Sequence, residues 1–420
     1  MKYEFLKLLK NKIVLLCILI SLVISVYIGV RRADNIVDND TDITQYTGEL
    51  TQEKNDNIEH EYMVARSNYE VSKNRVGEYN QEDILKYATI TKDDVDKMSE
   101  SDKKKYADAI YKWSNVYGNV ENCKKSIEFR ETVKKNSLML AETGDTYTRN
   151  VNEKAHKMYS SKVKYEVFGS NVAINMINDW IDVNYADYIN IICIIIMVCL
   201  IFLIEHSSNT YSMIFTSYNG RFKTYFNKSI IVIIISALLA IITTVISIVP
   251  YVGKEEFMQV LKADIQNFAE YIYSPFDLKL YQIALLMIVL RILAYISIAA
   301  VLTFITTFFK KSIVPFGAGT LLFCGGFAMY SKLVDKINLM EGSGTGISSV
   351  SDKYKLYRMY TPFGFLRNGI KYFATYEPNN ILDKPVLTIM IAICVHLVYI
   401  VAFFVAGYVV YRFRFRRKGV

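Results

Sequence analysis

The side chains of this sequence that could do chemistry are few, and they lie inside or beside long apolar segments. A polar stretch, residues 205–228, separates two runs rich in isoleucine and valine and ends on basic residues. Arg291 and His396 each lie within an apolar run. Such groups face a partner, a cavity or the lipid headgroups, because an isolated charge in hydrocarbon is costly. We therefore expect them to act by hydrogen bonding, ion pairing or docking.

Motifs for catalysis and nucleotide binding are missing from the 420 residues. Without a Gly-x-x-x-x-Gly-Lys-Ser/Thr loop, the chain cannot bind and hydrolyse ATP by that route. It also has no His-Glu-x-x-His pair, no Gly-x-Ser-x-Gly elbow and no Cys-x-x-Cys pair, and its four histidines are scattered. We expect no catalytic residue, no metal site and no cofactor in this chain, and we expect it not to be an enzyme.

The apolar residues, 52% of the chain, come in blocks long enough to cross a membrane. A hydrocarbon core about 30 Å thick needs roughly 20 apolar residues of helix. The first block is interpreted as an uncleaved anchor, because Arg31 and Arg32 follow it where a cleaved signal would have small residues. The sequence thus predicts an all-α polytopic membrane protein with six transmembrane helices. The six windows are residues 13–30, 186–204, 229–250, 281–309, 312–330 and 386–411.

Lysine and arginine beside these windows predict the orientation. Residues 1–12 are read as a basic amphipathic helix and residues 412–420 as a basic tail, which places both termini in the cytoplasm. With six spans, the 205–228 loop lies in the cytoplasm too. These flanks explain most of the formal net charge of +8, so no nucleic-acid partner is expected. The expected location is a plasma membrane, with lipid as a direct partner.

Residues 31–185 are predicted to form an extracellular, mainly helical domain. Apolar and tyrosine residues recur at intervals of four and three along 58–79 and 106–127, as on packed helices. This seam is interpreted as packing within the domain rather than a partner site. Thr91 and Ser99 are expected helix starts, and a third helix is expected over 146–168. Cys123, the only cysteine outside the apolar windows, is expected to form no intrachain disulfide.

Two further segments are expected to be extracellular loops. Residues 251–280 have an amphipathic pattern, with their apolar face predicted to lie on the membrane surface. Residues 331–385 are aromatic and basic around Thr361-Pro362, which suits a pair of short helices at the interface, although packing alone also explains the pattern.

The 205–228 segment resembles the first cytoplasmic loop of type-2 ATP-binding-cassette (ABC) exporter permeases. In that family an acidic residue closes the second span, a short coupling helix ends in small polar residues, and an arginine and a lysine follow. Asn209 stands where the family usually has a glycine. Thr361-Pro362-Phe363 is similar to the family's Ser-Pro-Phe before the last span, and the large domain after the first span resembles sodium-efflux and antibiotic-exporter permeases. The resemblance assigns ATPase coupling to Glu205, Asn209, Thr210, Gly220, Arg221 and Lys228.

The resemblance implies a permease subunit in a bacterial plasma membrane. Its implied partners are separate ABC ATPase subunits, which carry ATP-Mg, and a second permease in a homo- or heterodimer. The implied cargo is a peptide, an antibiotic or another hydrophobic substrate. The alternative is a non-transporting receptor or scaffold whose extracellular helical domain binds a partner. Taken alone, Arg221 and Lys228 also fit ordinary flanking charges that anchor to anionic headgroups.

Four residues are candidates for the translocation path. Arg291 lies in a window longer than a span needs, so it either slides out to the headgroups or lines a cavity. His396 has either a hydrogen-bonded structural role or a place on the path. Gly317 and Gly319, with Gly325 and Gly326, are expected to let helices pack closely along it.

Overall fold

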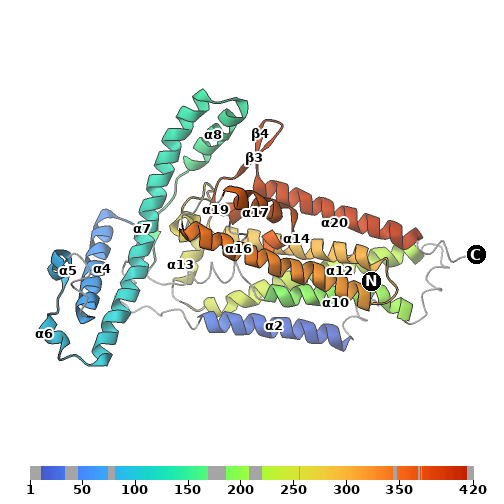
Figure 1. The fold of residues 1–420 in the computed structure, drawn as a ribbon, viewed down its shortest axis with the longest axis horizontal. Helices are drawn as coiled ribbons and strands as arrows, with labels where there is room; N and C mark the ends of the chain where they lie inside the picture. The colour runs from blue at the N-terminus through green and yellow to red at the C-terminus, as the bar shows by residue number, and fades with distance from the viewer. Residues whose placement is uncertain are drawn as a thin grey trace, which may run out of the picture.

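The computed structural model is a mainly helical molecule with a long bundle and a helical domain at one end of it (Figure 1). It describes residues 11–33, 46–73, 81–168, 186–207, 220–254, 256–343, 348–367, 369 and 371–413. Within these residues, six helices are long and apolar enough to cross a membrane, which agrees with a helical multi-pass membrane protein.

The bundle is built around α14, which packs against α10, α12 and α20, while α2 packs against α10 and α12. The fifth span is continuous through three pieces, and a π-helical turn joins its two α-helices. The helices are α2 (Lys12–Ala33), α10 (Ala186–Ser207), α12 (Gly220–Ile248), α14 (Leu280–Thr306), α15 (Ile313–Gly319), η6 (Thr320–Gly325), α16 (Gly326–Ser343) and α20 (Thr388–Phe413). Two spans extend by seven residues beyond one end of their expected windows, since the third begins at Phe222 and the fifth continues to Ile337.

The helical domain follows the first span and is closed by a short antiparallel pair of strands. Its central helix, α7, is 44 residues long and crosses the end of the bundle at a steep angle (Figure 1). The elements are β1 (Gly48–Glu49), α4 (Gln52–Ser72), α5 (Gln81–Tyr87), α6 (Lys92–Val95), α7 (Glu100–Thr143), α8 (Thr146–Tyr159) and β2 (Glu166–Val167).

The predicted seam between helices is a packed core, as interpreted. Ile58 of α4 is buried with Val116 and Val120 of α7. Tyr62 and Tyr117 stack with their ring centroids 4.3 Å apart. Such ring pairs add to the stabilisation that apolar burial gives the domain.

The expected helix starts are also confirmed. Thr91 and Asp94 form a reciprocal capping box, and the hydroxyl of Ser99 accepts from the backbone N–H of Asp102 at 3.2 Å. The predicted third helix is too long, because α8 ends at Tyr159 and the chain then runs extended into β2. Cys123 is free and buried, and burial raises the pKa of its thiol to about 12.

The 251–280 segment does not lie on the membrane surface through its apolar face, and that prediction is wrong. Its short helices are η3 (Val249–Tyr251), α13 (Phe257–Lys262), η4 (Ile265–Asn267) and η5 (Ala269–Tyr271). Phe257, Val260, Ile265 and Phe268 are all buried in the core that continues from the bundle. The same periodicity is compatible with an apolar face packed in a protein core and with one lying on lipid, so the pattern alone does not distinguish the two environments.

The helical domain is fixed to this segment by buried polar contacts. The guanidinium of Arg130, in α7, donates to the carbonyl of Ser274 at 3.0 Å and to the hydroxyl of Ser161 at 2.8 Å. The side chain of Asn267 accepts from the N–H of Glu166 at 3.0 Å and donates to the carbonyl of Lys164 at 3.0 Å. The domain therefore sits on the bundle through fixed hydrogen bonds.

The chain between the fifth and sixth spans folds into three short helices and a hairpin. These are α17 (Ser348–Tyr360), α18 (Phe363–Leu366), α19 (Lys371–Ala374), β3 (Pro378–Ile381) and β4 (Lys384–Leu387). Arg358 is buried, forms an ion pair with Glu377, and has the Tyr372 ring centroid 4.9 Å from its guanidinium carbon. Of the two explanations for residues 331–385, packing within the protein therefore holds for Arg358, which does not reach the membrane interface.

Gly319 and Gly317 lie two residues apart on the fifth span in very different surroundings. A Cβ on Gly319 would come within 2.7 Å of Leu302 Cδ2 and 3.2 Å of Ile195 Cγ2, whereas one on Gly317 would meet nothing within 4 Å. Close helix packing therefore depends on Gly319 and not on Gly317.

We predict that Gly319→Ala destabilises the bundle and that Gly317→Ala does not. Adding a methyl group to a packed contact typically costs about 1–3 kcal/mol, while alanine at an open helical position is neutral or slightly favourable. Thermal unfolding of both variants in lipid nanodiscs measures the difference. Equal midpoints for the two variants would contradict the packing assigned to Gly319.

Candidate functional site

A buried ion pair lies inside the bundle where α10 and α14 meet. The guanidinium of Arg291 donates from Nη2 to Oδ2 of Asp187 at 3.3 Å, and its Nε lies 3.2 Å from Oδ1 of the same carboxylate. Arg291 is 1% exposed and Asp187 is 0% exposed. The prediction that Arg291 slides out to the headgroups is therefore wrong, because its charge is matched inside the protein.

Further groups complete the bonding around this pair. Tyr295, one helical turn after Arg291, donates its hydroxyl proton to Asp187 Oδ1 at 2.5 Å. Arg291 Nη1 donates to the hydroxyl of Thr244 at 3.1 Å, and that hydroxyl donates in turn to the carbonyl of Ala240. Because the Thr244 hydroxyl donates its proton to a carbonyl of its own helix, its oxygen lone pairs are available to accept a hydrogen bond from the guanidinium.

Asn190 adds a second contact with α12 and extends the bonding to α2. Its amide donates to the hydroxyl of Tyr295 at 2.8 Å and to that of Thr243 at 3.2 Å. Its carbonyl accepts from the hydroxyl of Ser21 in α2. We call the whole set the buried polar network. It consists of Ser21, Asp187, Asn190, Thr243, Thr244, Arg291 and Tyr295.

Local spacing explains why one network reaches four helices. Asp187 and Asn190 are three residues apart on α10, and Arg291 and Tyr295 are four apart on α14, so each pair shares one helix face. These faces meet in an interior of low dielectric, where a matched ion pair is retained and an unmatched charge is very costly. The network can hold four helices in one register, and no acid–base chemistry is needed for that role.

Where the structure describes them, the residues assigned to ATPase coupling lie on parts of α10 and α12 remote from the residues of this network. Glu205 lies near the end of α10, and Gly220 and Arg221 begin α12, whereas Asn209 and Thr210 fall outside the described residues. Along α10, Glu205 is 18 residues from Asp187, or about 27 Å at 1.5 Å per residue.

Lys228 differs from the expected headgroup anchor. It lies two turns inside α12 and is 0% exposed, with its ammonium 5.7 Å from the centroid of the Phe202 ring. A cation over an aromatic face is stabilised by the ring quadrupole. Lys228 therefore belongs to the contact between α10 and α12 and does not reach the lipid surface.

The other residues assigned to a path are separated from one another. His396 is buried in α20 with its Nδ1 2.7 Å from the carbonyl of Ala392, and its ring packs against Phe365 at a centroid distance of 4.6 Å. These contacts favour the hydrogen-bonded role over a place on a path. Gly319 packs against Leu302 and Ile195, and Gly317 faces open space.

Sequence reasoning missed most of the buried polar network. Asp187 was the detectable member, because it is an acidic residue one position inside an apolar window. The two threonines, Asn190 and Tyr295 gave no comparable signal, because such residues are common in transmembrane helices without a shared role.

Comparison with known proteins identifies no relative. No protein-family model, no curated protein and no solved structure matches this chain.

We predict that removing one member of the ion pair is more harmful than replacing both. Arg291→Met leaves a buried carboxylate unmatched, which typically costs about 3–5 kcal/mol, whereas an apolar replacement of the whole pair is often neutral. Arg291→Met with Asp187→Leu should therefore recover much of the midpoint of thermal unfolding that Arg291→Met loses. A double variant as unstable as the sum of the single variants would show that the two charges are not coupled.

Proposed function

We propose that this chain is the membrane permease of an ATP-driven exporter of the type-2 ABC class. It works with a second permease and with separate ATPase subunits that bind ATP-Mg. Its cargo is a peptide, an antibiotic or another hydrophobic molecule. The resemblance of the 205–228 segment to coupling loops is the starting point of this proposal, and the arrangement of the described helices supports it.

The supporting observation is the position of the helix ends that flank this segment. In Figure 1 the end of α10 and the beginning of α12 lie at the far end of the bundle from the helical domain, together with the beginning of α2 and the end of α20. A soluble ATPase docked there would meet the segment and both chain ends without obstruction by the helical domain.

Movement of the segment has a direct route into the bundle. The segment connects α10 and α12, and both helices carry members of the buried polar network towards their other ends. From Gly220 to Thr244 the helix rises about 36 Å. Helices tied by buried hydrogen bonds move as a unit, so closure of the ATPases would tilt α10, α12 and α14 together. Such a rigid-body motion is the proposed change of access.

The second permease has an available surface on the fifth span. Leu321 is 81% exposed and Met329 is 76% exposed on a span that lies at the periphery of the bundle. In the proposed dimer, part of this surface faces the second permease and the remainder faces lipid.

We predict that Arg221→Glu disrupts binding of the ATPase subunits. The tagged chain is purified gently from its native membrane, and co-purifying proteins and ATP hydrolysis are measured in the same fraction. The wild type should carry a stoichiometric P-loop ATPase, and Arg221→Glu should lose most of it, because reversing a charge in an interface costs several kcal/mol.

A matched control reverses a charge at the other end of the molecule. Lys157→Glu changes an exposed residue of α8 and should leave the ATPase bound. A wild-type chain that brings no ATPase under several mild detergents would contradict the proposal and would favour the receptor or scaffold. Equal loss in both variants would show that the 205–228 segment is not the contact.

A further inference from the structure

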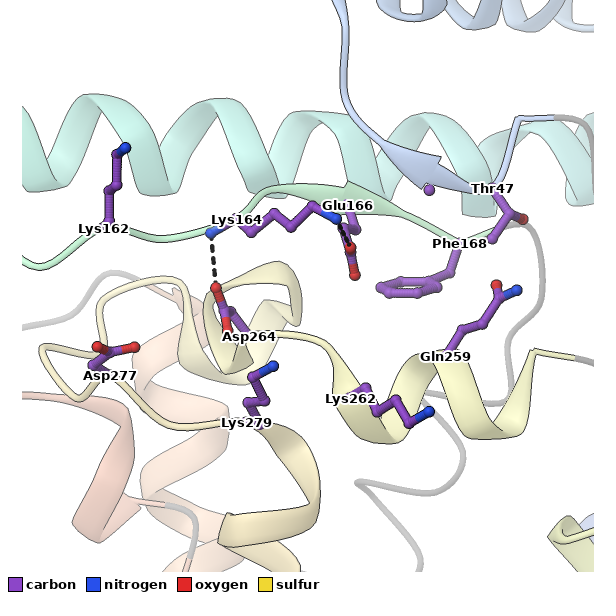
Figure 2. A pocket seen from close by; sticks show the side chains of 11 residues that line it. Thr47, Lys162, Lys164, Glu166, Phe168, Gln259, Lys262, Asp264, Asp277 and Lys279 are labelled. Atoms are coloured by element: carbon purple, nitrogen blue, oxygen red, sulfur yellow. Dashed lines mark hydrogen bonds and ion pairs between the residues drawn. The ribbon is translucent and has the colours of Figure 1, made fainter.

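A charged cleft separates the base of the helical domain from the segment that leads into α14 (Figure 2). Its volume is about 630 Å³. One wall comes from β1 and residues 162–168, which include β2, and the other from α13 and the residues up to Lys279. The residues that line it are Thr47, Gly48, Lys162, Lys164, Glu166, Phe168, Gln259, Lys262, Asp264, Asp277 and Lys279.

The two walls are held in place without any ligand. Lys164 donates its backbone N–H to Asp264 Oδ2 at 2.7 Å, across the cleft, and Asn267 bonds to the backbone of both Lys164 and Glu166. Phe168 stacks on Phe268, with ring centroids 5.8 Å apart. The cleft is therefore a fixed feature of the junction.

The lining of the cleft carries four lysines and three carboxylates, so it has one net positive charge. The ammonium of Lys164 binds Glu166 at 2.9 Å, a hydrogen bond that raises the pKa of Lys164. The carboxylate of Asp264 is engaged by the backbone of Lys164. Among the described residues, no carboxylate lies within ion-pair distance of Lys162, Lys262 or Lys279.

These three lysines come from three different segments. Lys162 follows α8, Lys262 ends α13, and Lys279 precedes α14. Figure 2 shows Lys162 on one wall, with its side chain directed away from the other wall, and Lys262, Lys279 and Asp277 on the opposite wall. Because an amide hydrogen bond does not remove the charge of Asp264, three ammonium groups stand against two carboxylates, Asp264 and Asp277, and the lining keeps one net positive charge for an anion.

The position of Lys279 indicates which anion is within reach. Lys279 directly precedes Leu280, the first residue of an apolar span of 27 residues. The ends of such spans lie at the level of lipid phosphates, where lysine side chains accumulate. Lysine is a common phosphate ligand that acts as a point charge.

We propose that this cleft binds a phosphate group, carried either by an anionic phospholipid in the adjacent leaflet or by a soluble phosphate ester. Lys262 and Lys279 hold the phosphate from the bundle side. This inference is independent of the proposed export function.

The test uses the full chain in nanodiscs of phosphatidylcholine alone, of phosphatidylcholine with phosphatidylglycerol, and of phosphatidylcholine with added glycerol 3-phosphate. The midpoint of thermal unfolding is measured in each, because a ligand that binds only the folded state raises it. We expect phosphatidylglycerol or glycerol 3-phosphate to raise the midpoint of the wild type. A rise with phosphatidylglycerol identifies lipid as the source, and a rise with glycerol 3-phosphate alone identifies a soluble ester.

The variant Lys262→Gln with Lys279→Gln should bind phosphate about tenfold to thirtyfold more weakly, since each lysine near a membrane contributes roughly 1 kcal/mol. Lys262→Arg with Lys279→Arg should retain binding. The matched control is Lys135→Gln with Lys157→Gln, two exposed lysines of the helical domain that do not line the cleft.

All variants must show the wild-type midpoint in phosphatidylcholine alone, which separates binding from folding. The proposal is overturned if neither phosphate raises the midpoint of the wild type. It is equally overturned if the rise survives in the double glutamine variant or disappears in the control.

Discussion

A buried ion pair in an apolar bundle is the constraint on which this structure depends. Arg291 and Asp187 lie in helices that are otherwise almost continuous hydrocarbon, and neither charge is tolerable there without the other. Their pairing fixes α10 against α14. Tyr295 and Asn190 then carry the same bonding to α12 and α2. Because hydrogen bonds are directional, the buried polar network sets helix rotation and depth, which apolar contacts between transmembrane helices define less sharply.

The network also explains how the two ends of the bundle relate. Asp187 is the second residue of α10, so the network lies towards the helical domain and away from the helix ends that flank the 205–228 segment. At the domain end, Arg358 of α17 forms a further ion pair with Glu377, the residue that precedes β3. Both ion pairs thus lie towards the end of the bundle near the helical domain, and α10 and α12 extend from there to the opposite end.

Much of the fold could be predicted from the sequence because its signals are local. Six apolar windows gave six helices, and the spacing of Ile58 and Val120 marked a packed core. The wrong predictions concern what surrounds a residue in the folded protein. For Arg291 the sequence offered headgroups or a cavity and not an ion pair, because its partner lies 104 residues away. The face of Phe257 and Val260 was assigned to lipid, although it packs against protein. Local periodicity predicts that one face of a helix is buried. Only the tertiary structure shows whether protein or lipid buries that face.

The central claim is that the end of the bundle carrying the 205–228 segment faces the compartment that holds ATP. Single cysteines at Lys223, exposed at the start of α12, and at Lys157, exposed on α8, can be labelled with a membrane-impermeant maleimide in intact cells. Background from native thiols should be low, since five of the six cysteines lie in spans and Cys123 is buried. The account predicts labelling of Lys157→Cys in intact cells and of Lys223→Cys only after permeabilisation. The reverse pattern would contradict it.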